Sequence, residues 1–321
     1  MTQNETMAGD TYDPAKSDGI AGRLVRTLIR RSRLVRSVIK SATVQHQIMT
    51  WRALTVVGGR RGRFLALQLL GGRTGGYELR DSGLTFHVRH RTGDVAILNK
   101  IFARDTGLNS YEAPAEVAAA IGTAPRILDV GANIGMFGLW ALKCWPGAQI
   151  TAYEPDPDNL RVLRRTVAAN AVGDRWTVLA TAVSNAPTEL SFVPGLRAEA
   201  HIAAMHENGT LTVPAIDFYE QQGSGVDLVK MDIEGGEWAI LADPRLSELK
   251  ATAIRLEWHT MLCPQPDAHA AAIELLRSGG FTRILDADYE DERNGVLWAW
   301  REPGAARSDA RPAATRTASA V

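Results

Sequence analysis

The sequence predicts an α/β fold in which helices cover both faces of a seven-stranded, mostly parallel and doubly wound sheet. From Arg126 onward, short apolar runs alternate with segments of helical periodicity, which is typical of a parallel sheet. The last two apolar runs are separated by only ten residues, 286–295. A parallel crossover needs a dozen or more residues, so these two strands must form an antiparallel hairpin at the C-terminal end of the fold.

Each element is predicted from its own pattern of apolar residues. Strands are expected at 126–130, 149–153, 176–183, 226–233, 253–259, 281–285 and 296–301, with a short hairpin strand near 190–193. Helices are expected at 136–144, 157–170, 237–241 and 268–278. Asp156 stands near the N-cap of the second helix, and Gly279-Gly280 follow the last helix, as glycines often do at helix C-termini.

The chain divides into four predicted segments. They are a disordered tail over 1–18, a basic and mainly helical extension over 19–75, the α/β domain over 76–302, and a disordered tail over 303–321. The two tails have too few large apolar residues to bury enough apolar surface, so we expect them to be disordered. The extension carries twelve Arg or Lys and no acidic residue between Gly19 and Tyr77. Residues 23–40 have the periodicity of a basic amphipathic helix, and a second helix is expected at about 44–57.

Two interpretations of the basic extension stay open. It adsorbs to an anionic membrane surface, where each basic residue contributes about 1 kcal/mol, or it packs on the main domain or on a second subunit. Packing is favoured, because amphipathic helices mostly cover cores. Few aromatic residues lie among the basic ones, which argues against nucleic-acid binding. The oligomeric state does not follow from the sequence.

Composition limits the class of protein. Thirty-six basic residues balance thirty-six acidic ones, and 45% of the residues are apolar, as in ordinary globular proteins. Cys144 and Cys263 are the only cysteines, which excludes a disulfide framework and a cysteine zinc site. No apolar run approaches ~18 residues, and the N-terminus lacks the apolar core of a secretory signal. We therefore expect a cytoplasmic protein, with peripheral contact at the inner membrane surface as the alternative tied to the basic extension.

The first chemical motif is a glycine turn between the strand 126–130 and the helix 136–144. It reads Asp129-Val130-Gly131-Ala132-Asn133-Ile134-Gly135. A Cβ there would block the close approach of a ligand to the backbone, and the free N–H groups of the helix N-terminus suit an anionic or carboxylate-bearing ligand. The spacing lacks the middle glycine of Gly-x-Gly-x-x-Gly, which argues against a nicotinamide dinucleotide. A purely structural turn is the alternative.

A carboxylate follows the next strand. Glu154-Pro155-Asp156 ends the strand 149–153, about twenty residues after the glycine turn. An acidic side chain in that place accepts the ribose hydroxyls of an adenosine ligand. The same letters are good turn chemistry, but together with the glycine turn they favour the ribose acceptor.

Two later strands also end in charged residues. In Lys230-Met231-Asp232-Ile233-Glu234-Gly235-Gly236-Glu237, the side chains of Lys230, Asp232 and Glu234 are expected on one side of the strand. Burying them without partners would cost several kcal/mol per ion, which favours a functional role. Glu257 and His259 share a face at the C-terminal end of the following strand, and ligands of open parallel sheets bind just beyond such ends.

These motifs together resemble the S-adenosylmethionine-dependent methyltransferases of the FkbM family. The resemblance spans about residues 91–300 and is carried by Gly93-Asp94-Val95-Ala96, the glycine turn, Glu154-Pro155-Asp156, the run from Lys230 to Glu237, and Leu256-Glu257-Trp258-His259. It implies a Rossmann-like fold and O-methylation of a hydroxyl on a sugar or a polyketide-type natural product. It does not cover residues 1–75, so the basic extension takes no role from it.

The resemblance implies S-adenosyl-L-methionine as cofactor and a small hydroxylated molecule as acceptor. The expected cofactor-binding residues are Asp129, Gly131, Ala132, Asn133, Gly135, Glu154, Pro155, Ala182 and Asp232. In catalysis, we expect His259 to be the general base, oriented by Asp232 or Glu257. Alternatively, a divalent Mg²⁺ or Mn²⁺ held by these three residues would polarise the hydroxyl.

Two other function classes stay open. One is a nicotinamide-dependent oxidoreductase, and the other is a catalytically inactive methyltransferase fold that binds partners through its basic helix. Acceptor specificity is expected from residues 194–210, with His201 and His206 as polar contacts, and from residues 76–112, where Tyr111 is expected over the cofactor. The identity of the acceptor does not follow from the sequence.

Overall fold

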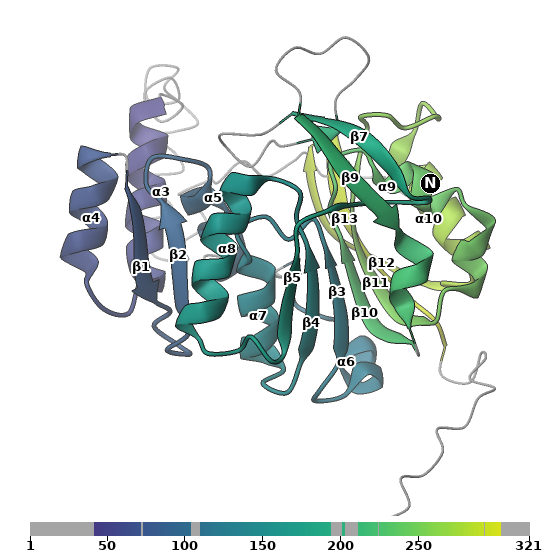
Figure 1. The fold of residues 1–321 in the computed structure, drawn as a ribbon, viewed down its shortest axis with the longest axis horizontal. Coiled ribbons are helices and arrows are strands. Elements are labelled where there is room, and N and C mark those ends of the chain that lie inside the picture. The colour runs from purple at the N-terminus through teal and green to yellow at the C-terminus, as the bar shows by residue number, and fades with distance from the viewer. Residues whose placement is uncertain are drawn as a thin grey trace, which may run out of the picture.

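A seven-stranded sheet forms the centre of the computed structural model, which describes residues 42–71, 73–103, 110–193, 201–202, 211–223, 225–291 and 293–302. The strand order is β12-β13-β11-β10-β3-β4-β5 (Figure 1). These strands are β3 (Arg126–Val130), β4 (Gln149–Tyr153), β5 (Trp176–Leu179), β10 (Val226–Met231), β11 (Ala251–His259), β12 (Arg283–Asp291) and β13 (Asn294–Trp300). Strands β5, β4, β3, β10 and β11 run parallel, whereas β13 is antiparallel to both β11 and β12. The predicted fold class is confirmed.

Helices cover the two faces of this sheet. On one face lie α6 (Ala115–Ile121), α7 (Met136–Cys144) and α8 (Pro157–Ala169), and on the other lie α9 (Glu237–Leu241) and α10 (Ala268–Ser278). The period-2 pattern of the strands explains this division, because Ile127 belongs to the first apolar core and its neighbours Leu128 and Val130 belong to the second. The sheet is therefore buried on both faces, and its strand ends are held between two packed layers.

The described part of the basic extension packs on the α/β domain. It forms α3 (Ala42–Val56) and α4 (Arg61–Leu70), followed by the hairpin of β1 (Thr74–Glu78) and β2 (Thr85–Arg89) and by α5 (Asp94–Phe102). Figure 1 shows these elements on one side of the molecule, next to α8. Ala53 and Phe64 share one apolar core with α7, and the backbone N–H of Thr85 donates to Asn170 Oδ1 at 2.8 Å. The second predicted helix of the extension, at about 44–57, is confirmed as α3.

The amphipathic helix predicted at 23–40 and both predicted disordered tails lie outside the described residues. Membrane adsorption by the extension therefore stays a prediction. None of the helices within the described ranges combines the length and the hydropathy needed to cross a bilayer.

A small second sheet departs from the prediction. It consists of β6 (Ala182–Ser184), β7 (Thr188–Val193), β8 (His201–Ile202) and β9 (Leu211–Asp217), in the order β6-β9-β7-β8. The strand predicted at 176–183 is divided between β5 of the central sheet and β6 of this one. The hydroxyl of Thr181 donates to the carbonyl of Pro214 at 2.8 Å and thereby joins the chain to β9. Pro214 lies within β9, and a proline normally argues against a strand, so β9 was not predicted.

The C-terminal hairpin is longer than expected. Residues 286–291, predicted as loop, continue β12, with register shifts between Asp286 and Asp288 and between Asp288 and Asp291. The acidic residues of this segment conceal a strand in the sequence, because the apolar alternation that indicates a half-buried strand is missing from them. Two 3-10 helices, η2 (Phe218–Gln222) and η3 (Pro244–Glu248), complete the described structure.

Candidate active site

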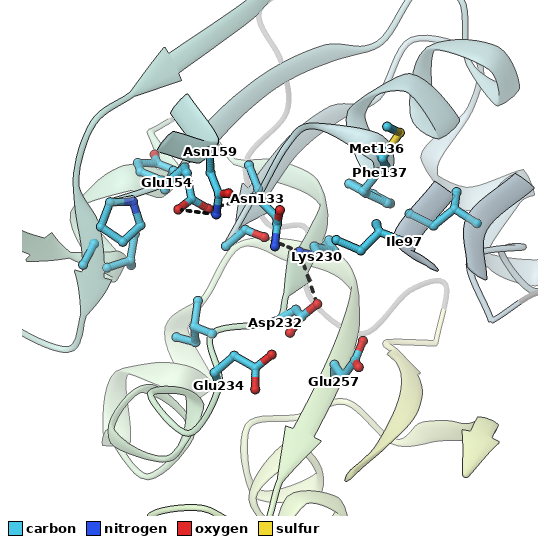
Figure 2. A pocket seen from close by; sticks show the side chains of 18 of the residues that line it. Ile97, Asn133, Met136, Phe137, Glu154, Asn159, Lys230, Asp232, Glu234 and Glu257 are labelled. Carbon is cyan, nitrogen blue, oxygen red and sulfur yellow. Dashed lines mark hydrogen bonds and ion pairs between the residues drawn. The ribbon is translucent and has the colours of Figure 1, made fainter. Parts of the chain in front are cut away.

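A cavity lies at the carboxyl ends of the central parallel strands (Figure 2). Its floor is made by the residues that follow β3, β4 and β10, and its wall includes α5. This is where open α/β sheets bind ligands, because the chain leaves neighbouring strands in opposite directions there. Of the expected site residues, those that line the cavity are Gly131, Ala132, Asn133, Glu154, Pro155, Ala182, Asp232 and Glu257. Asp129, Gly135 and His259 lie behind this lining.

The two glycines of the turn are required by close contacts inside the protein. Gly131 has a φ of 81°, and a Cβ there would stand 1.8 Å from the carbonyl oxygen of Asp232. Gly135 has a φ of 86°, and its Cβ would stand 2.4 Å from Leu163 Cδ1 of α8. The sequence argument assigned the need for glycine to the approach of a ligand. In the structure, contacts with other segments of the same protein already require glycine at both positions. Gly131 also borders the cavity.

Glu154 joins the glycine turn to the end of β4. Its side chain is buried, with Oε2 accepting from the backbone N–H of Asn133 at 2.7 Å and Oε1 from that of Asp156 at 2.9 Å. Burial raises the pKa of Glu154 to about 7, against the opposing effect of these hydrogen bonds. A carboxylate offers about four lone-pair sites, so Oε2 keeps the capacity to accept from a hydroxyl in the cavity. This fits the expected ribose contact.

Lys230 connects the ends of β3 and β10. Its ammonium donates to the carbonyl oxygen of Gly131 at 2.6 Å and lies 3.4 Å from Asp129 Oδ1 and 3.7 Å from Asp232 Oδ2. Figure 2 shows Lys230 between the turn and the acidic side chains of the cavity. Asp129 is fully buried and serves as a counter-charge to Lys230 from below the cavity floor. The ion pairs explain how a lysine is accommodated inside a buried strand.

An acidic cluster occupies the other end of the cavity. Asp232, Glu234 and Glu257 line it, and His259 lies directly behind them. Single ligand atoms of Asp232, Glu257 and His259 lie within 4.8 Å of one another, so the structure brings together the three residues expected in catalysis. Glu234, which the sequence analysis placed on the same side of the chain as Asp232, also borders this space.

His259 is held by a carboxylate other than the two expected. Its Nδ1 lies 3.1 Å from Glu237 Oε1, which also accepts from the backbone N–H of His259 at 2.8 Å. The role of orienting His259 had been expected from Asp232 or Glu257. The sequence analysis treated Glu237 only as part of a motif. Its spacing of three residues from Glu234 could have suggested that both carboxylates contact one histidine.

The acidic cluster does not fit a divalent cation. Glu257 Oε1 accepts from the ammonium of Lys100 at 2.9 Å, Glu257 Oε2 lies 3.8 Å from the guanidinium of Arg255, and Asp232 faces Lys230. Two of the three candidate ligands are thus already neutralised by basic groups that would repel a metal ion.

Tyr111 closes the cavity from the side of α5. Its ring is buried, with the Arg255 guanidinium 3.7 Å from the ring centroid and the ring of Phe137 at 6.0 Å. Tyr111 lines the cavity, and its expected place over the cofactor stays a prediction. Of the two histidines expected to contact the acceptor, His201 begins β8 and His206 lies outside the described residues.

Comparison with known proteins identifies the family. Residues 129–283 match the model of the "Methyltransferase FkbM domain". This part of the chain is therefore an FkbM methyltransferase domain. The activity of this FkbM methyltransferase is methyl transfer, and the family implies S-adenosylmethionine as the methyl donor. The matching family is thus one of methyltransferases. The sequence analysis had kept a nicotinamide-dependent oxidoreductase as an alternative.

Three relatives illustrate the similarity. The chain is 26% identical over 224 residues to methyltransferase sdnD of Sordaria araneosa, an alignment covering 57% of this chain and 84% of that protein. It is 26% identical over 202 residues to the 31-O-demethyl-FK506 methyltransferase FkbM of Streptomyces tacrolimicus, covering 50% and 74%. The crystal structure of methyltransferase FkbM from Methylobacillus flagellatus KT superposes with a TM-score of 0.41 at 17% identity, covering 56% of this chain and 44% of that one.

Proposed function

We propose that this FkbM methyltransferase transfers the methyl group of S-adenosylmethionine to a hydroxyl of a sugar or polyketide-type small molecule. The proposal rests on two groups that line one cavity. The buried carboxylate of Glu154, which can accept hydrogen bonds from a ribose, lies at one end, and the acidic cluster lies at the other. The Streptomyces relative is a 31-O-demethyl-FK506 methyltransferase, and the name of its substrate describes an oxygen that lacks its methyl group. This supports oxygen as the acceptor atom.

The half of the cavity near β3 and β4 is assigned to the methyl donor. Glu154 accepts from the ribose hydroxyls, and Asn133 and Pro155 border the nucleoside. S-adenosylmethionine supplies a methyl group already activated by its sulfonium charge. Lys230 keeps the glycine turn at a fixed distance from Asp232, so the donor site is formed before binding.

The half near β10 and β11 is assigned to the acceptor. Apolar side chains of Ile97, Met136 and Phe137 line the same cavity and exclude water from it. Holding the hydroxyl in line with the methyl group contributes about 7–11 kcal/mol to such reactions, and a carboxylate or imidazole that takes the hydroxyl proton adds roughly 10²–10⁴-fold. The acidic cluster supplies candidates for that proton acceptor.

A labelled methyl donor tests this function. The full chain is incubated with trideuteromethyl S-adenosylmethionine and a panel of methyl glycosides and polyketide-type alcohols, with and without EDTA. We expect a trideuteromethyl ether on one acceptor class and the same rate in EDTA, because basic groups already neutralise the acidic cluster.

Matched carboxamide variants control this test. Asp232→Asn is expected to lose activity, and Asp174→Asn, at an exposed position, is expected to keep it. A label found on nitrogen or carbon would contradict O-methylation, and loss of activity in EDTA that Mg²⁺ or Mn²⁺ restores would contradict the metal-free site.

A further inference from the structure

Glu234 stands in an unusual backbone conformation beside the cavity. It follows β10 with a φ of 50° and is succeeded by Gly235 with a φ of 101°. Left-handed backbone is uncommon for a residue other than glycine. The conformation is retained because Glu237 Oε2 accepts from the backbone N–H of Gly235 at 2.8 Å. Backbone outliers of this kind, which the surrounding structure holds in place, are found most often at functional sites.

Glu234, His259 and Glu237 form a continuous line of close charged contacts, with His259 in the middle. His259 Nε2 lies 3.3 Å from Glu234 Oε2, and His259 Nδ1 lies 3.1 Å from Glu237 Oε1. The Glu234 side chain is 29% exposed, while those of His259 and Glu237 are 7% and 0% exposed. Only the Glu234 end of the line therefore meets the cavity, and both imidazole nitrogens of His259 face carboxylates.

The surroundings divide the charges along this line. Burial alone would lower the pKa of His259, but the hydrogen bond and charge of Glu237, with the charges of Asp232 and Glu234, raise it to about 10. Burial raises the pKa of Glu234 to about 7; Asp232, Glu257 and Glu237 act in the same direction, and His259 opposes them. The basic groups that face these carboxylates are Lys100 on Glu257, Lys230 on Asp232 and Arg255 on Glu257.

We propose that Glu234 accepts the proton of the reacting hydroxyl, and that His259 and Glu237 are positioning residues that hold its carboxylate toward the cavity. This inference rests on the proposed function and refines it, since the sequence had assigned the proton to His259. A charged imidazole between two carboxylates has no lone pair left for a proton. Glu234 has both the open face and the lone pairs.

The step balances with the groups named. The hydroxyl oxygen forms a bond to the methyl carbon as the carbon–sulfur bond of the donor breaks, and the electron pair of that bond passes to sulfur. The hydroxyl proton passes to a Glu234 oxygen. The products are a methyl ether, S-adenosylhomocysteine and a protonated Glu234, which returns its proton to water after the products leave.

Histidine NMR tests the proton assignment without an acceptor. The full chain is labelled with ¹⁵N-histidine and saturated with S-adenosylhomocysteine, and the signal of His259 is assigned by its loss in His259→Gln. We expect an imidazolium that persists well above neutral pH, and a lower titration midpoint in Glu237→Gln. A neutral His259 at neutral pH would overturn the inference, because the imidazole could then be the base.

Kinetics test Glu234 itself on any acceptor that the panel identifies. Glu234→Gln should lower kcat by roughly 10²–10⁴-fold with little change in affinity for S-adenosylhomocysteine, whereas Glu248→Gln, at an exposed position, should match the wild type. While His259 keeps its proton, Glu237→Gln should move the acid limb of the kcat profile to lower pH, because the charge of Glu237 is one of those that raise the pKa of Glu234. An unchanged kcat in Glu234→Gln would overturn the inference. If the wild type methylates no member of the panel, the proposed function fails, and the NMR titration still decides the state of His259.

Discussion

Gly131→Ala is expected to abolish binding of S-adenosylhomocysteine and to destabilise the fold. The new Cβ would stand 1.8 Å from the carbonyl oxygen of Asp232, so the ends of β3 and β10 must separate. Overpacking of this kind costs about 1–3 kcal/mol, and a φ of 81° costs an alanine on the order of another 1–3 kcal/mol. Separation of the strand ends also displaces Lys230, which contacts both of them.

A second glycine isolates the effect of the clash. Gly83 has a φ of 72° with nothing within 4 Å of a Cβ built on it, so Gly83→Ala carries only the backbone penalty. Denaturant unfolding should show a larger loss of stability in Gly131→Ala than in Gly83→Ala. Calorimetry should show that only Gly131→Ala loses binding of S-adenosylhomocysteine. Equal losses of stability in the two variants, with ligand binding retained, would show that the turn at Gly131 does not pack against the residues that follow β10.

Lys230→Met is expected to be the most destabilising substitution of a charged residue at the site. Lys230 is buried beside the fully buried Asp129. Removing one partner of such a pair leaves an uncompensated charge and costs about 3–5 kcal/mol. Because the remaining Asp129 would regain stability by taking up a proton, the free-energy loss measured by denaturant unfolding should shrink as the pH falls.

A double variant distinguishes lost charge compensation from lost packing. Lys230→Met combined with Asp129→Asn removes the orphaned charge and should recover part of the stability, with a weaker dependence on pH. If the double variant is as unstable as the sum of the two single variants, Asp129 and Lys230 are not coupled, and the assigned role of Asp129 is wrong.

The elements that position the site could be predicted because their signals are local. The bounds of β3 and β4 and those of α7 match the predictions, and Asp156 caps α8 by accepting from the backbone N–H groups of Asp158 and Asn159. Apolar periodicity marks strands that are buried on both faces, and a cap residue satisfies N–H groups within its own turn.

What the sequence could not predict depends on contacts between distant segments. The link from Glu237 to His259 joins residues 22 positions apart, and the contact of Lys100 with Glu257 joins residues 157 positions apart. Neither has a sequence pattern. The reason for Gly131 was also hidden, because only the fold reveals that Asp232 approaches it.

Calorimetric titration with S-adenosylhomocysteine tests the central claim, that the glycine turn and Glu154 bind the nucleoside of the methyl donor. We expect heat with one site per chain, and tighter binding one unit above than one unit below the Glu154 pKa of about 7, because the carboxylate must be charged to accept from the ribose. Glu154→Gln should bind weakly and with little dependence on pH. A folded wild-type chain that gives no heat at either pH would contradict the claim.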